Sequence, residues 1–167
     1  MNSTRMAIPL ICVLSQIFLP EARTFSFRVS ASQQKAAPRV APQFTVESQG
    51  DVLDEGGRRL ALTGYRATDG VLVTNVHGIF DSPSEADSYF EKETAKAMKV
   101  VRRGLKKNRK GDSVGRRAEV LYPPSPPNTK AVPAVLWTDG TSYYVLISPS
   151  LPDILSLEKK WSRQPDY

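Results

Sequence analysis

His77 is the only histidine of the chain and the residue best suited to act as a catalytic base. It lies in the segment Asn75–Asp81, and serines follow at positions 82, 84 and 88. An imidazole near a carboxylate and a hydroxyl is the set that nucleophilic hydrolysis uses. The sequence has no Gly-x-Ser-x-Gly motif, and the spacing does not require these side chains to meet. A small hydrolase that uses His77 with Asp81 and a nearby serine is therefore only our second hypothesis for the function.

Metal and cofactor chemistry has little support in the residue types. A zinc site takes three or four His, Cys or carboxylate ligands, and the chain has one histidine and one cysteine, Cys12. Asp51, Asp54 and Glu55 precede two glycines, but they lack the ligand alternation of an EF-hand, so we interpret this segment as a turn. A glycine-rich phosphate loop is also missing from the sequence. We expect no cofactor and no metal.

Positive charge is the strongest signal in the chain. The 167 residues include 23 Lys and Arg against 17 Asp and Glu, a net charge of +6, and segment 92–117 alone holds eleven basic and two acidic residues. Drawn as a helix at 100° per residue, Phe90 to Leu105 has an apolar face and an opposite cationic arc. This pattern predicts an anion-binding surface, which the next loop extends. Its predicted residues are Lys92, Lys96, Lys99, Arg103, Lys106, Lys107, Arg109, Lys110, Arg116 and Arg117.

Several partners would suit such a surface. A basic amphipathic helix favours an acidic protein partner or peripheral contact with an anionic membrane. Nucleic acid would bind on charge alone, but export makes it a less suitable partner. Solubility is a simpler role for the same charges. Our leading hypothesis is a non-catalytic binding or accessory module of the cell envelope rather than an enzyme. A polyanion binder that acts without export is a third interpretation.

The N-terminus has the features of an export signal. Arg5 precedes the apolar stretch Ala7–Leu19, which is shorter than the roughly 20 residues needed to span a bilayer as a helix. We expect a signal peptide over residues 1–31 with cleavage between 22 and 31, and a periplasmic or secreted protein. An uncleaved anchor is the alternative. If the signal is cleaved, the mature chain contains no cysteine, because Cys12 lies in the signal.

The rest of the chain divides into a linker and one domain. Residues 32–43 carry two prolines and no apolar period, which is typical of a flexible linker. A single domain is expected over residues 44–162, followed by a tail at 163–167. This length excludes a barrel of eight βα units and a dinucleotide-binding fold with two halves.

Turn and cap signals predict the elements of the domain. Asp-Gly pairs at 69–70 and 139–140 predict hairpins over 59–76 and 134–148. Further strands are expected at 44–47 and 117–122, and five prolines exclude a central strand over 122–133. Ser82 and Glu85 form a capping box for a long amphipathic helix that ends near Gly104, and a short helix is expected over 152–161. The fold class is α+β: an antiparallel sheet of about five to six strands with helix packed on one face.

Overall fold

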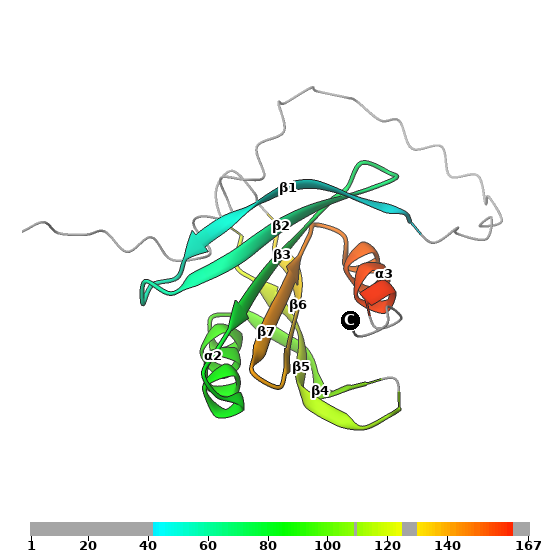
Figure 1. Ribbon diagram of the computed structural model, residues 1–167. Helices are drawn as coiled ribbons and strands as arrows, with labels where there is room; N and C mark the ends of the chain where they lie inside the picture. Colours follow the sequence, from blue (N-terminus) through cyan, green and yellow to red (C-terminus); the bar gives the residue numbers. More distant parts are fainter. Residues whose placement is uncertain (1–41, 109, 125–129, 162–167) are drawn as a thin grey trace, which may run out of the picture.

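A seven-stranded antiparallel sheet forms the centre of the molecule (Figure 1). The computed structural model describes residues 42–108, 110–124 and 130–161. The predicted signal at 1–31, most of the linker and the tail lie outside these residues. The strands are β1 (Phe44–Leu53), β2 (Arg59–Ala67), β3 (Leu72–Ile79), β4 (Lys99–Lys107), β5 (Ser113–Tyr122), β6 (Val132–Asp139) and β7 (Ser142–Ile147); the helices are α2 (Pro83–Ala95) and α3 (Leu151–Trp161).

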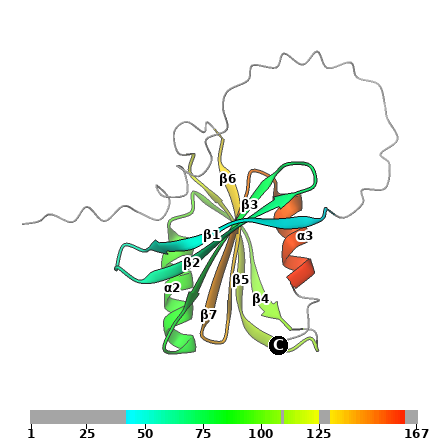
Figure 2. The same ribbon diagram turned by 45° about the horizontal axis from the view of Figure 1, so that its top comes forward.

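Two meanders join to make the sheet. Its strand order is β1-β2-β3-β7-β6-β5-β4, so β3 of the first meander pairs with β7 of the second. The strands at the β1 end cross those at the β4 end at a large angle, as expected from the right-handed twist of strands (Figure 2). Within the described chain, β1 and β4 are the two edges of the sheet.

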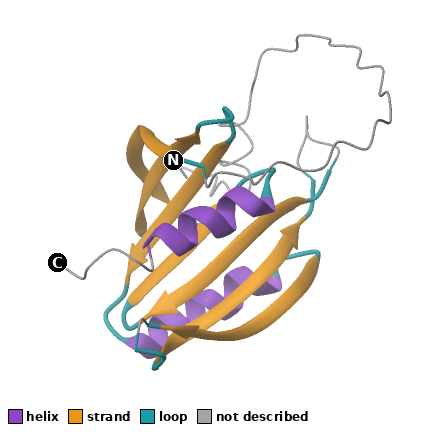
Figure 3. Ribbon diagram, turned by 90° about the vertical axis from the view of Figure 1, so that its right-hand side faces the viewer, coloured by secondary structure: helices purple, strands orange, loops and turns teal. Residues whose placement is uncertain are grey.

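The sheet buries apolar side chains on both faces, and a helix covers each face (Figure 3). Alternate residues of a strand point to opposite faces, which explains the division. On β7, Tyr143 packs with Phe90 of α2 in the larger core, whereas Leu146 packs with Ile154 and Leu157 of α3 in the smaller one. The expectation of helix on one face only is therefore wrong, although the α+β class is confirmed.

The predicted long helix is also wrong in extent. α2 begins after the Ser82 cap, whose hydroxyl accepts a hydrogen bond from the Glu85 N–H at 3.2 Å, but the helix ends at Ala95. The chain then turns and continues as strand β4, which pairs with β5. Pairing of the β-branched Val100 with Val120 outweighs the helix propensity of the many Lys and Arg residues. The sheet therefore has seven strands rather than five or six.

Other expectations from the sequence are confirmed in whole or in part. Both Asp-Gly hairpins form as β2–β3 and β6–β7, with Gly70 at φ 86° and Gly140 at φ 57°. Of the three carboxylates expected in a turn, Asp51 lies in β1, whereas Asp54 and Glu55 follow it in the turn, where Asp54 Oδ1 accepts the N–H groups of Gly56 and Arg58 at 2.8 Å. The exclusion of a central strand over 122–133 is wrong at the end of that segment. β6 begins at Val132, and Pro133 lies in this interior strand opposite Leu121 of β5.

A close backbone approach between β5 and β6 gives a stability test. A Cβ at Gly115 would lie 2.1 Å from the carbonyl oxygen of Thr138, whereas a Cβ at Gly104 on β4 would meet nothing within 4 Å. We expect Gly115→Ala to lower the free energy of unfolding by about 1–3 kcal/mol, because the backbone must shift. The matched Gly104→Ala variant should change it by less than about 0.5 kcal/mol. Urea unfolding followed by circular dichroism measures both, and equal values would contradict this account.

Candidate anion-binding surface

The predicted anion-binding residues do not share one helix face. Lys92 and Lys96 lie at the end of α2, and Lys99, Arg103, Lys106 and Lys107 lie on β4. Lys110 lies in the β4–β5 turn, and Arg116 and Arg117 lie on β5. Arg109 falls outside the described residues. The prediction of a cationic helix is therefore wrong, because its basic residues are divided between a helix, a hairpin and both faces of the sheet.

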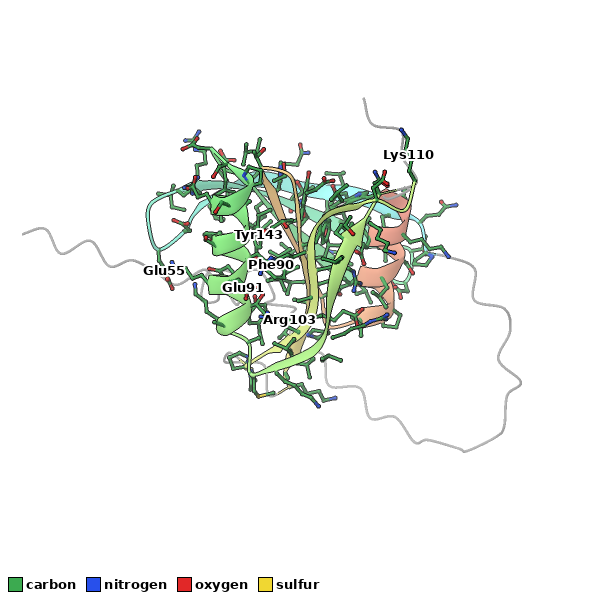
Figure 4. The ribbon with its side chains drawn as sticks, turned by 90° about the horizontal axis from the view of Figure 1, so that it is seen from below. Glu55, Phe90, Glu91, Arg103, Lys110 and Tyr143 are labelled. Atoms are coloured by element: carbon green, nitrogen blue, oxygen red, sulfur yellow. The ribbon has the colours of Figure 1, made fainter. Side chains whose placement is uncertain are left out.

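On the α2 face, two arginines of the hairpin pair with acids of the helix. Arg103 of β4 lies 3.1 Å from Glu91 of α2, and Arg116 of β5 lies 2.5 Å from the same carboxylate. Arg116 also lies 3.2 Å from Asp87. Glu91 and Arg103 are side by side in Figure 4, between α2 and β4. These cations hold the hairpin against the helix and are already neutralised.

The two lysines of α2 are neutralised in a similar way. Lys96 lies 2.9 Å from Glu93 and 3.2 Å from Glu55 of the β1–β2 turn, and Lys92 lies 3.4 Å from Glu55. Burial disfavours the charged form of Lys96, but its contacts with Glu93 and Glu55 outweigh burial and raise the pKa of the ammonium group. The same contacts, mainly that with Lys96, lower the pKa of Glu55. The end of α2 is therefore balanced in charge.

On the α3 face, a buried carboxylate collects two more cations of the hairpin. Both Glu158 oxygens accept hydrogen bonds from Arg117 at 2.8 Å, and Lys106 also donates to Glu158 at 2.8 Å. The Lys106 ammonium lies 4.6 Å from the ring centre of Trp137. Burial disfavours charge on Glu158, but these donors outweigh it and lower the pKa of its carboxyl group. Glu158 therefore fixes the hairpin to α3.

Four cations of the hairpin have no acidic partner in the part of the chain that the structure describes. Their side chains are exposed, and they lie along β4 and in the turn that follows it. Figure 4 shows Lys110 at the far end of the hairpin, well away from α2. Three of the four belong to the predicted set, and Arg102 was missed because the helical model did not place it on the cationic arc. They are Lys99, Arg102, Lys107 and Lys110.

β4 also exposes apolar side chains. Val101 is 52% and Leu105 61% exposed, and Met98, just before the strand, is 59% exposed. Half of the large hydrophobic residues that are exposed in the described chain lie on β4 or directly before it. Sequence reasoning missed this feature because the helical model turned Val101 and Leu105 toward the core.

His77 and Asp81 are not joined by a hydrogen bond among the described residues. His77 lies on β3 and stacks on Tyr144 of β7, with ring centres 4.4 Å apart. Burial lowers its pKa, so the imidazole is neutral near pH 7, and its Nε2 atom has no hydrogen-bond partner within the described chain. The Ser82 hydroxyl caps α2, and the Ser88 hydroxyl donates to the carbonyl of Ser84. The hydrolase alternative stays a prediction without support from these contacts.

The described chain also has a pocket beside α2. It has a volume of about 550 Å³ and lies between the β1–β2 turn and α2, where Arg58 pairs with Glu85 and lies 4.3 Å from the ring centre of Phe80. Its strongest charges are thus already paired.

None of the described helices is long and apolar enough to cross a membrane. The described residues contain no group of three or more His, Cys, Asp or Glu residues placed to hold a metal ion.

Comparison with known proteins gives no match: no family model fits the chain, and no curated protein or solved structure is significantly similar to it.

The Glu158 contacts predict an acid-dependent stability. We expect Glu158→Gln to lower the free energy of unfolding at pH 7 by on the order of 2 kcal/mol, because the partly buried Lys106 and Arg117 lose this carboxylate. A carboxyl group with a lowered pKa stabilises the fold above its unfolded pKa, and that stabilisation is lost as the pH falls through its folded pKa. The difference between wild type and variant should therefore shrink below about pH 4.

Urea titrations at several pH values measure this dependence. Glu91→Gln is the matched control, since its carboxylate is 39% exposed and should contribute less than about 1 kcal/mol. A Glu158→Gln effect that is constant from pH 7 to pH 3 would contradict the assignment.

Proposed function

We propose that this protein is an exported, non-catalytic accessory module of the cell envelope that binds an acidic protein partner through β4. The supporting observation is the contrast within one hairpin. Arg103, Arg116, Arg117 and Lys106 pair with acids of the two helices, whereas Lys99, Arg102, Lys107 and Lys110 are exposed without an acidic partner among the described residues. Unpaired cations grouped on one edge attract an anionic partner and increase its rate of association.

The other residue types on β4 favour a protein over a lipid or a nucleic acid. The exposed apolar residues of the strand are two valines and a leucine, Val100, Val101 and Leu105. A nucleic-acid surface commonly adds aromatic residues that stack on bases, and β4 has none. A membrane-surface helix places Trp, Phe and Leu on one apolar face, and here the basic segment is a strand. The combination of exposed aliphatic side chains and cations on β4 therefore favours a protein segment as the partner.

Salt-sensitive binding to a defined acidic polymer tests the proposal. Poly-L-glutamate is the probe, at 50 mM and 300 mM salt, beside phosphatidylglycerol vesicles, lipopolysaccharide and single-stranded DNA. We expect poly-L-glutamate to bind, and the triple variant Lys99→Gln, Arg102→Gln, Lys107→Gln to bind it about tenfold more weakly, since each exposed charge contributes about 0.2–1 kcal/mol. Isothermal titration calorimetry or fluorescence anisotropy gives the affinities.

The control removes the same charge from other elements. It combines Arg59→Gln and Arg66→Gln on β2 with Lys160→Gln on α3. This triple variant should leave the affinity for poly-L-glutamate nearly unchanged. Equal losses in the two triple variants would indicate attraction by net charge alone and reject β4 as the site. Binding to vesicles or DNA but not to poly-L-glutamate would replace the acidic protein by that ligand class.

A further inference from the structure

β4 has an unpaired backbone edge. It is the last strand of the sheet in the described chain, and only β5 pairs with it. Its nine residues correspond to about 30 Å of strand, along which alternate N–H and C=O groups point outward. Such an edge can accept another strand, because the outward groups form the same ladder that the sheet forms inside.

Charged residues and β-bulges on an edge commonly prevent this pairing. β4 has both, since two of its lysines are exposed and its register on β5 shifts between Val100 and Arg102. It also exposes apolar side chains, because Val100, Val101 and Leu105 are 40%, 52% and 61% exposed. The edge therefore repels another cationic strand, and it offers both apolar contact and counter-charge to an acidic one.

The register of β4 on β5 places these two kinds of side chain on different faces. Directly opposed residues of an antiparallel pair point to the same side. Arg102 lies opposite Glu119, on the face that α3 covers, whereas Val100 lies opposite Val120, on the face that α2 covers. Lys99 lies opposite Leu121, on the same face as Arg102. A strand beside β4 would therefore meet Lys99 and Arg102 on the α3 face, and on the α2 face Val100 together with Arg103, which Glu91 already neutralises.

We propose that the partner binds by strand addition: an extended segment with alternating acidic and apolar residues pairs with β4 as an eighth strand, with its carboxylates toward Lys99 and Arg102. This inference rests on the proposed function and adds the structure of the bound segment.

A second copy of this chain is a poorer occupant. β1, at the opposite edge, supplies acidic residues, but Glu47 lies 2.5 Å from Arg66 and Asp51 lies 3.6 Å from Arg59, both on β2. Pairing β1 of one copy with β4 of another would compete with these contacts. A separate acidic segment has no such competing contact.

N-methylation of a synthetic peptide tests whether the backbone takes part. The parent probe is a nine-residue peptide of alternating valine and glutamate, with blocked ends. One derivative is N-methylated at every glutamate and the other at every valine, so each loses the donors along one edge of the strand. With glutamates facing the α3 side and the peptide running antiparallel to β4, only one edge can face β4. We expect one derivative to lose affinity by about tenfold or more and the other to bind like the parent.

Amide hydrogen exchange supplies the second measurement, on the full chain. Strand addition should slow exchange at alternate residues of β4, whereas contacts through side chains alone should not. Equal binding of both N-methylated peptides, or no added protection on β4, would overturn strand addition and leave the charge-based function standing if poly-L-glutamate still binds. Failure of both poly-L-glutamate and the parent peptide would reject both proposals. Concentration-dependent dimers without peptide, lost on Lys99→Gln with Arg102→Gln, would assign the edge to a second copy.

Discussion

The β4–β5 hairpin depends on ion pairs that reach both helices. Arg116 and Arg117 are neighbours in the sequence and point to opposite faces of the sheet, one toward Asp87 and Glu91 of α2 and the other toward Glu158 of α3. Because successive side chains of a strand alternate, this one dipeptide joins the hairpin to both layers. Acids of the two helices neutralise four cations of the hairpin, and the other four in the described chain lie exposed along β4 and in the turn that follows it. The charge available for binding is therefore a product of the packing.

Much of the sheet could be predicted because its signals are local. Asp-Gly turns need glycine in a left-handed conformation, and Gly70 and Gly140 adopt it, so the two hairpins follow from four residues. The Ser82 cap is equally local. The pairing of β3 with β7 is not, since it joins segments far apart in the sequence, and no nearby residue indicates it. The same applies to α3, which packs on the second face through Ile154 and Leu157.

The candidate site was predicted by residue type but not by arrangement. Nine basic residues within 99–117 favoured a helix on propensity, and a helix would have put most of them on one arc. A signal against it was available: Asn108 and Gly111 form a turn, in which the Asn108 side chain accepts the N–H groups of Lys110 and Asp112 at 2.9 Å. With Val100 and Val101 before it, this turn indicates a hairpin. Which cations are neutralised depends on Glu91 and Glu158, whose positions only the assembled fold supplies.

The two faces of the sheet also differ in their aromatic residues. Both tryptophans of the chain lie on the α3 side, where Trp137 and Trp161 have ring centres 6.0 Å apart, whereas the α2 core contains Phe90, Tyr89 and Tyr143. Tryptophan emission thus reports the α3 layer, and its Lys106 contact couples that signal to the hairpin. Tyrosine does not separate the two layers, because Tyr65 and Tyr144 also pack in the α3 core. Tryptophan emission does, so a change in it that precedes global unfolding identifies the α3 layer as the one that loosens first.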